Sequence, residues 1–432
     1  MTHGKNGGRI KKKTERRAHH GLEKPGNLSV ERLCSGTLWG RCALFWVKLI
    51  IYILKDTSLL LNHHDLKGSI FMFNIKKQIR NFYVISTLSS FQIAGASWVA
   101  LLAARGFSLA EIGIAEGVFH MASLLFEIPS GVISDVFGRK KCMILSQFMF
   151  IISALLMILS KGLPGICVSL VASAFGYNFA SGTREALAYD SLKVAGQEEK
   201  YLAYSSMEYS IYRIGSACAT LCAGLALYLG YRRANLIDMV MGSLCLLFCF
   251  RLKEVEAEQR QFDGTLGQRL LRCFRESFHF LTHNSSSLTL MLFNAFCGCI
   301  PVLTAFFLQA RLTENGLSAV WLGPGLFAIT LGGAVGAKAV TMVAKWDYRK
   351  VAVICVLGIA GGLVLSLHAA PLVMILGGFI GNLFDDMLQV RTDALLNERF
   401  PSAQRATLIS TSSLTFSLIM ILMSPLMGWL LS

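Results

Sequence analysis

The sequence predicts an all-α membrane protein that crosses the bilayer about eleven times, and three observations lead to that prediction. The 432-residue chain is 54% hydrophobic and 16% charged, with a mean hydropathy of +0.54, whereas soluble domains carry roughly 25% charged residues. From residue 72 onward, apolar runs of about twenty residues, long enough to cross a bilayer, alternate with short polar gaps. Because backbone groups in lipid must be hydrogen-bonded within their own segment, these runs are expected to be helices.

The apolar runs define eleven predicted spans in chain order. They cover residues 82–104, 108–133, 141–160, 164–188, 203–229, 234–251, 287–309, 319–343, 350–367, 371–390 and 406–431. The longest gap, 252–286, contains TLGQRLLRCFRESFHFL, in which apolar residues recur at helical spacing opposite basic ones. This pattern predicts an amphipathic helix along the inner membrane surface, between six spans and five.

Basic residues are concentrated in every second gap between the spans. If the residues before the first span are inside, most Lys and Arg residues of the gaps fall inside and few fall outside. This asymmetry predicts a multi-pass protein with a cytoplasmic N-terminus. The net charge of +15 is therefore attributed to membrane orientation, and no nucleic-acid partner is expected because no binding motif with interleaved aromatic residues is present.

The two halves of the chain carry similar segments at matching positions. TREALAYDSL (183–192) ends span four and RTDALLNERF (391–400) ends span ten, while FGRKKCMI (137–144) has a weaker counterpart in DYRKVAVI (347–354). Parallel halves of this kind are typical of transporters, in which the substrate path runs between them.

The stretch SGVISDVFGRKK (130–141), between spans two and three, resembles the signature loop of the major facilitator superfamily, G-x-x-x-D-(R/K)-x-G-(R/K)-(R/K)-(R/K). FEIPS and LNERFPSAQRATLIS are also similar to bacterial drug-efflux members, and the resemblance covers roughly residues 75 to 431. Val136 departs from the pattern, which has a base there. The residues that match the signature loop are Gly131, Asp135, Gly138, Arg139, Lys140 and Lys141.

The resemblance implies a six-plus-six helix architecture and a role for the signature loop in gating. By resemblance, Asp135 holds the two halves together in the outward-facing state, against the start of the eleventh helix near residues 405–407. From the residues alone, Asp135 needs a partner, either Arg139 four residues on or the N-terminal end of another helix. The alternative is a cytoplasmic loop whose bases serve orientation only.

Four segments follow from the spans and the resemblance. Residues 1–71 are a basic leader, 72–251 an N-terminal six-helix bundle, 252–286 a cytoplasmic linker and 287–432 a C-terminal bundle of five helices. Met72, followed by NIKKQIR, would be a natural start, so the leader is interpreted as an extension of the native chain; an extra helix at 38–54 is the alternative. A twelfth helix is expected for this architecture and is interpreted as missing.

Charges near or within the spans are the main candidates for function. Arg184, Glu185 and Asp190 could form a charge network with Arg139, or they could be charges at headgroup level. Charges deep in a bilayer are costly, so the acids within spans are either proton carriers or hydrogen-bonded structural groups. The candidates for proton coupling are Glu116, which shares a helix face with His120, Glu127 and Asp385.

Other charged residues fall within the spans and need partners. Arg213 and Lys338 require acids, for which Glu208 and Asp385 are plausible; Asp238 and Asp386 are also present. Candidates for the substrate path share a polar or aromatic character, although each could equally be a packing residue, and they predict a mostly apolar cavity. They are Gln92, Tyr177, Asn178, Tyr212, Arg213, Asn294 and Asn382.

Enzymatic function is not expected, and no cofactor or metal is predicted. GGAVGAK (332–338) lacks the spacing of a phosphate-binding loop, and its glycines are interpreted as a helix-packing face. The twelve cysteines lie mostly in apolar runs and form no ligand set, so they are interpreted as packing residues.

The resemblance and the cavity residues together predict a secondary transporter in a bacterial inner membrane. The expected reaction is proton-coupled export of small amphipathic molecules by alternating access, performed by a monomer whose partners are the bilayer, the substrate and protons. One alternative is uptake of a nutrient such as a sugar or organic acid. The alternative from another class is a non-transporting protein, either sensor-like or decayed.

Overall fold

The structure, a computed structural model, describes residues 74–255, 268, 275, 285–343, 345–399 and 405–432. In this part of the chain ten helical segments are long and apolar enough to cross a membrane, or eleven if the bent pair at Cys222 counts as one span. The prediction of an all-helical chain with about eleven spans is confirmed. The predicted leader and the amphipathic segment around 265–281 lie outside the described residues, apart from Gln268 and Arg275.

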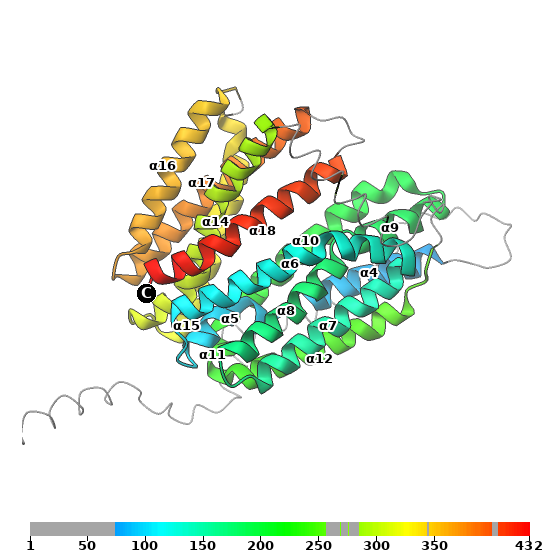
Figure 1. Ribbon diagram of the computed structural model, residues 1–432, viewed down its shortest axis with the longest axis horizontal. Coiled ribbons are helices and arrows are strands. Elements are labelled where there is room, and N and C mark those ends of the chain that lie inside the picture. The colour runs from blue at the N-terminus through cyan, green and yellow to red at the C-terminus, as the bar shows by residue number, and fades with distance from the viewer. Residues whose placement is uncertain (1–73, 256–267, 269–274, 276–284, 344, 400–404) are drawn as a thin grey trace, which may run out of the picture. The chain divides into compact units, whose positions relative to one another are not determined.

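Among the described residues, the helices form six spans up to Arg251 and five from Ser285 onward. Figure 1 shows how these helices are arranged. The first six spans comprise α4 (Ile75–Ser90), α5 (Trp98–Ala103), α6 (Leu109–Phe137), α7 (Arg139–Leu159), α8 (Leu163–Ala180), α9 (Thr183–Val194), α10 (Tyr201–Leu221), α11 (Ala223–Leu229) and α12 (Tyr231–Arg251). The last five are α14 (Ser285–Glu314), α15 (Ala319–Ala339), α16 (Tyr348–Ser366), α17 (Pro371–Arg399) and α18 (Arg405–Leu430).

Three spans that the hydropathy pattern predicts as continuous are interrupted. The first is broken between Ser90 and Trp98, where only a short 3-10 turn (Gly95–Ser97) intervenes between α4 and α5. The fourth is broken at Gly182, whose φ of +70° is a left-handed conformation that glycine adopts without steric cost. The fifth bends by 50° at Cys222. Hydropathy measures length and apolarity, so it does not detect these breaks.

Each set of helices has its own buried core. In the first set, Phe82 and Ile85 of α4 pack with Leu187 of α9 and Leu252, all nearly inaccessible. In the second set, Cys297 of α14 packs with Cys355 of α16 and neighbouring apolar residues. The buried cysteines serve as small packing residues, and no group of three or more potential metal ligands occurs in the described part of the chain.

The two sets meet along α6 with α18, α5 with α14, and both α10 and α11 with α15, which together we call the outer interface. Figure 1 shows α18 lying along α6. Glycine permits the closest approaches, because a Cβ at Gly113 would overlap the Ser424 carbonyl and one at Gly323 would overlap the Leu221 carbonyl. These contacts lie toward the helix ends that the charge asymmetry assigns to the outer side. The described conformation is therefore closed at those ends.

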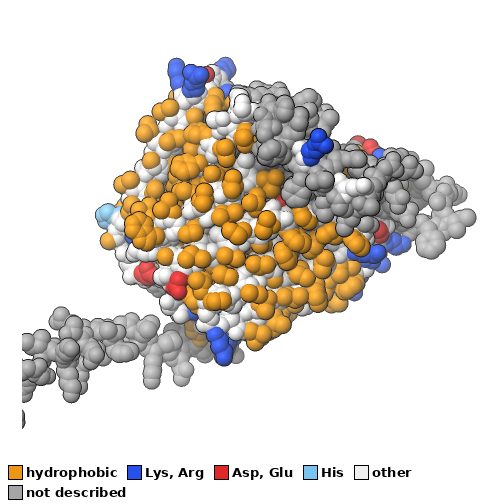
Figure 2. Space-filling view, in the orientation of Figure 1, with side chains coloured by type: hydrophobic (Ala, Val, Ile, Leu, Met, Phe, Trp, Pro, Cys, Tyr) orange, Lys and Arg blue, Asp and Glu red, His pale blue; other side chains and the backbone are white. Residues whose placement is uncertain are grey.

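Apolar side chains cover much of the outside of the helices. Figure 2 shows hydrophobic side chains spread over the visible face, with charged side chains concentrated toward its margins. Large apolar residues such as Leu125, Leu357 and Leu372 are among the most exposed. A soluble protein rarely exposes so much contiguous apolar surface, so this face is suited to lipid.

Packing of the first helix set continues past its predicted end at residue 251. The Gln78 side chain accepts a hydrogen bond from the Lys253 amide (3.1 Å) and donates one to the Lys253 carbonyl (3.0 Å). Leu252 and Val255 are buried in the same core as Phe82. The chain is thus held against α4 as far as Val255.

Candidate substrate cavity and ion pairs

The break in the first span is held by a carboxylate from α12. Asp238 Oδ1 accepts a hydrogen bond from the Ile93 amide (2.8 Å), and Oδ2 accepts from the amides of Ala94 (3.0 Å) and Gly95 (2.9 Å). A broken helix in a bilayer exposes backbone N–H groups whose burial without partners costs several kcal/mol each, and the carboxylate supplies those partners. Asp238 therefore stabilises the interruption itself.

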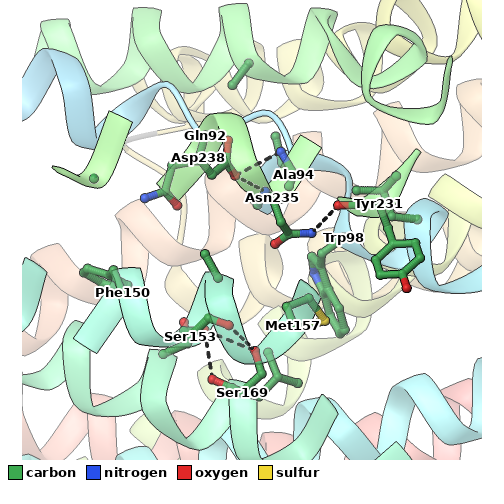
Figure 3. Close-up of a pocket in the computed structure, with 18 of the residues that line it drawn as sticks. Gln92, Ala94, Trp98, Phe150, Ser153, Met157, Ser169, Tyr231, Asn235 and Asp238 are labelled. Atoms are coloured by element: carbon green, nitrogen blue, oxygen red, sulfur yellow. Dashed lines mark hydrogen bonds between the residues drawn. The ribbon is translucent and has the colours of Figure 1, made fainter. Parts of the chain in front are cut away.

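A cavity of about 480 Å³ lies beside this break, mainly within the first helix set (Figure 3). Gln92, Ala94 and Trp98 line one wall, and Asn235 and Asp238 of α12 line another. Its volume lies within the roughly 300–1,000 Å³ range of small-molecule sites. Pockets near interrupted helices are a common arrangement for substrate sites in transporters.

The cavity lining combines aromatic rings with hydroxyl groups. Its six rings each come from a different helix, and six of its eight hydroxyls belong to serines, the other two to Tyr212 and Tyr231. The aromatic residues are Trp98, Phe119, Phe150, Tyr212, Tyr231 and Phe306, and the serines are Ser89, Ser90, Ser153, Ser169, Ser173 and Ser216. The lining is therefore more polar than the mostly apolar cavity that the sequence predicts.

Arg105 contributes a cation at one end of the cavity. Its Nη1 donates to Ser160 Oγ (3.1 Å) and its Nη2 to the Ser160 carbonyl (2.7 Å). The guanidinium carbon lies 4.2 Å from the centre of the Tyr231 ring, a cation–π geometry. Both terminal nitrogens of the Arg105 guanidinium are thus hydrogen-bonded to Ser160, and one of its faces lies on Tyr231.

Glu116 and His120 form a buried pair that reaches from the cavity to the outer interface. Glu116 Oε1 lies 3.4 Å from His120 Nε2, and both residues are less than 10% exposed. Glu116 lines the cavity, whereas His120 Nδ1 lies 3.4 Å from Ser417 Oγ of α18. The ring of His120 also meets the edge of Phe416. Two titratable groups therefore connect the cavity to a surface between the helix sets.

The other two predicted proton-coupling residues lie apart from this pair. Glu127 is half-buried on α6, and no hydrogen bond to its carboxylate is found among the described residues. Asp385 is 5% exposed and lies beside Gly298 of α14, and its Oδ1 has no hydrogen-bond partner among the described residues. Asn294 Nδ2 donates to Gln389 Oε1 (2.6 Å) nearby, where a second cavity of about 240 Å³ opens.

The predicted substrate-path residues separate into two groups. Gln92 and Tyr212 line the larger cavity, together with Trp98, whereas Asn294 lines the smaller one. Asn178 instead joins α8 to α6, since its amide both accepts from and donates to Ser123 (2.8 Å each).

Three further predicted path residues lie outside both cavity linings. Tyr177 is exposed, and Asn382 donates to the Gly378 carbonyl of its own helix (3.0 Å). Arg213 Nε donates to Tyr209 Oη (2.9 Å). None of the six serines of the lining was identified from the sequence, and Asp238 was recognised only as a charge within a span.

Arg139 of the signature loop forms an ion pair that the sequence suggests only as one contact within a possible charge network. Gly138 has a φ of +99°, and Arg139 begins α7 and forms an ion pair with Asp190 of α9. Glu254 accepts from the amides of Arg139 and Lys140 (2.9 Å each), so it caps α7 with a favourable charge. The side chain of Asp135 lies outside the described part of the structure, and so does the predicted contact with residues 405–407.

Arg184 forms a second group of ion pairs. Its Nε lies 3.1 Å from Glu208 Oε1 and its Nη2 lies 3.4 Å from Glu185 Oε1. Ser86 Oγ also donates to Glu208 Oε1 (2.5 Å), which ties α4 to the same carboxylate. The prediction that Glu208 would pair with Arg213 or Lys338 is wrong. Of the residues predicted to form one network, Arg139 pairs with Asp190, and Arg184 pairs with Glu185 and with Glu208.

Interrupted spans around an internal cavity, buried ion pairs and two helix sets joined at one end define a multi-pass membrane transporter. A sequence profile of the Major Facilitator Superfamily matches residues 82–344. The chain belongs to that superfamily, as the signature loop indicates.

Known proteins similar to this chain are transporters of the same superfamily or share its fold. The chain is 22% identical over 346 residues to the uncharacterized MFS-type transporter YxaM of Bacillus subtilis (strain 168), a match covering 77% of this chain and 84% of YxaM. A mutant of the nucleoside transporter NupG has a similar fold, with a TM-score of 0.66 and 14% identity over 82% of this chain and 90% of NupG. An inward-facing, unoccupied bacterial homologue of the human lysosomal transporter Spinster gives a TM-score of 0.63 and 14% identity, covering 81% of each chain.

Proposed function

We propose that the protein is a proton-coupled exporter of small amphipathic molecules that functions as a monomer. The observation that carries this proposal is the cavity of about 480 Å³ whose aromatic rings come from six different helices. Rings arriving from several sides suit a flat or bulky apolar body, while scattered serine hydroxyls offer polar contacts without demanding one fixed pattern. Such a lining favours compounds with an apolar body and a polar group.

Glu116 is the residue to which we assign proton coupling. Its carboxylate borders the cavity, and its partner His120 contacts Ser417 across the outer interface. Adding or removing a proton changes the charge of the Glu116–His120 pair. That change alters the contact between His120 and Ser417, which must separate when the outer side opens. A proton site of this kind links cavity occupancy to the position of the two helix sets.

The location that we propose is a bacterial inner membrane, with the N-terminus in the cytoplasm. The distribution of Lys and Arg between alternate gaps supports that orientation. In this orientation the outer interface is the periplasmic closure, and the described conformation presents no open path on that side. An exporter would bind its substrate from the cytoplasm in such a conformation.

Nutrient uptake is the second candidate, and the serine-rich lining favours it. Six serine hydroxyls together with Gln92 and Asn235 could bind a polyhydroxylated compound. NupG, which has a similar fold, is named a nucleoside transporter. If vesicles accumulate a labelled nutrient on the cytoplasmic side and do not move ethidium, the proposed function changes from export to uptake.

Replacing the proposed proton carrier should separate coupling from binding. In Glu116→Gln proteoliposomes, we expect ethidium movement to lose its response to an imposed pH gradient, whereas exchange of ethidium between the two sides continues. The reason is that glutamine keeps the size of the side chain and one acceptor oxygen but carries no titratable proton. Fluorescence quenching with and without the gradient measures both activities.

Glu111→Gln is the matched control, because Glu111 is on the same helix but forms the exposed capping box with Ser108. Glutamine preserves that cap. Ethidium movement by the Glu111→Gln variant should therefore respond to the pH gradient as it does in the wild type. An unchanged gradient response in Glu116→Gln would move the proton site to Asp385 or Glu127.

A further inference from the structure

The break in the first span leaves backbone N–H groups and backbone carbonyl groups without partners inside a helix. The N–H groups are bound by a side chain of the protein, whereas the carbonyl groups lie at the end of α4, beside the cavity. The three N–H groups of Ile93, Ala94 and Gly95 all point to the Asp238 carboxylate. Ionised carboxylates only accept hydrogen bonds, so these donors are occupied and unavailable to a ligand. Figure 3 shows the carboxylate directed at this segment at the edge of the cavity.

The carbonyl side of the same break has a different environment. A helix that ends leaves its last four carbonyl groups without partners inside the helix, and its C-terminal end carries partial negative charge. Here α4 ends at Ser90, and both Ser89 and Ser90 line the cavity. Ser90 Oγ donates to the Thr87 carbonyl (3.2 Å), so the broken span offers the remaining carbonyls of this helix end as hydrogen-bond acceptors.

Other lining groups strengthen this bias. Asn235 Nδ2 donates to the Tyr231 carbonyl (2.8 Å), which uses one of its two N–H groups, and its amide oxygen is an acceptor on this side of the cavity. Glu116 adds a carboxylate. The cation of the lining, Arg105, has both terminal nitrogens engaged with Ser160 and one face over Tyr231. The lining thus carries two carboxylates, those of Asp238 and Glu116, against one guanidinium that the protein itself already holds.

We infer that this cavity recognises molecules carrying hydrogen-bond donors, as neutral or cationic compounds, and discriminates against organic anions, with Asp238 as the positioning residue. This inference rests on the proposed substrate cavity and specifies its ligand class. By occupying three N–H groups, Asp238 removes the backbone donors that would otherwise bind a carboxylate or phosphate. Its own negative charge adds to the exclusion, because anions brought near it in a low-dielectric site are repelled.

A matched set of three probes tests this inference by binding alone. The probes are 2-(1-naphthyl)ethylamine, 2-(1-naphthyl)ethanol and 1-naphthylacetate, which share the ring and differ in the polar group. In thermal-shift titrations of the purified full chain, we expect the amine and the alcohol to bind at least about tenfold more tightly than the carboxylate, which corresponds to about 1.4 kcal/mol. Equal or tighter binding of the carboxylate overturns the inference, as does the absence of binding by all three.

Asp238→Asn provides the second arm. Asparagine replaces one acceptor oxygen by an NH₂ group, so at least one backbone N–H becomes available and the negative charge is lost. We expect the preference for the amine over the carboxylate to fall about tenfold, and the peptide covering residues 91–98 to exchange hydrogen faster. Asp238→Glu, which keeps the charge, should retain the preference. If Asp238 had a purely structural role, Asp238→Asn would weaken the binding of all three probes equally. That result would overturn the assignment of Asp238 as the residue that sets the ligand preference.

The two proposals fail in distinguishable ways. Binding with the expected order but no gradient-driven movement of ethidium would reject export while retaining the ligand class. Ethidium export accompanied by tight carboxylate binding would retain the transporter and reject the ligand class. If Asp238→Asn does not fold, the wild-type probe series and Asp238→Glu still decide, because neither depends on that variant.

Discussion

Gly113→Leu should shift the transporter toward its outward-open state and lower the transport rate. The Gly113 position faces the Ser424 backbone, where even a Cβ would overlap the carbonyl. A larger side chain penalises only the conformation in which α6 and α18 are in contact. Forcing extra atoms into a packed contact costs about 1–3 kcal/mol, which corresponds to a population shift of roughly five- to more than a hundredfold.

Hydrogen exchange measures this shift directly. In Gly113→Leu, peptides covering 109–120 and 417–430 should exchange faster than in the wild type, and Gly113→Ala should show a smaller change in the same direction. Gly361→Leu is the matched control, because nothing lies within 4 Å of a Cβ built at Gly361 in α16. Unaltered exchange in the Gly113 variants would show that the outer interface does not limit opening.

Removing the cation at Arg184 should destabilise the first helix set strongly. Arg184→Met leaves Glu208 buried without its ion-pair partner, and breaking a buried pair from one side costs about 3–5 kcal/mol. The double variant Arg184→Met with Glu208→Leu should recover most of this loss, because the buried carboxylate is gone and the one that remains, that of Glu185, is partly exposed to solvent. Thermal unfolding in detergent measures the three proteins side by side.

Arg233→Met is the control for loss of a positive charge, since Arg233 is exposed and has no ion pair among the described residues. Its unfolding temperature should match that of the wild type. If Arg184→Met unfolds at the wild-type temperature, or the double variant is less stable than the single one, the ion pair does not stabilise the fold.

Much of the architecture follows from hydropathy and charge, but the features that form the cavity do not. Span length and apolarity are properties of contiguous residues, so the eleven runs could be identified. The break before Trp98 depends on Asp238, a residue about 145 positions further along the chain. The only local signals were the small residues of IAGAS and, for the fourth span, the SGT stretch around Gly182.

The ion-pair partners of buried charged residues were predicted less accurately than the spans, because pairing depends on how each helix is rotated relative to its neighbours. Glu208 and Arg213 lie on one helix, and the sequence does not give the rotation of that helix relative to α9. The structure directs Glu208 to Arg184, while Arg213 contacts Tyr209. By contrast, the pairing of Glu116 with His120 could be predicted, because residues four apart on a helix share a face whatever the tertiary packing.

The contacts of residues 252–255 bear on how the gene can be divided into two separately expressed halves. Lys253 is bonded to Gln78, Glu254 caps α7, and Val255 is buried with α4. A first fragment that stops at Arg251, where hydropathy ends the sixth span, would discard all three attachments and leave the amides at the start of α7 without their carboxylate. A first fragment that extends through Val255 keeps them, so co-expressed halves should reassemble more efficiently when the cut follows that residue.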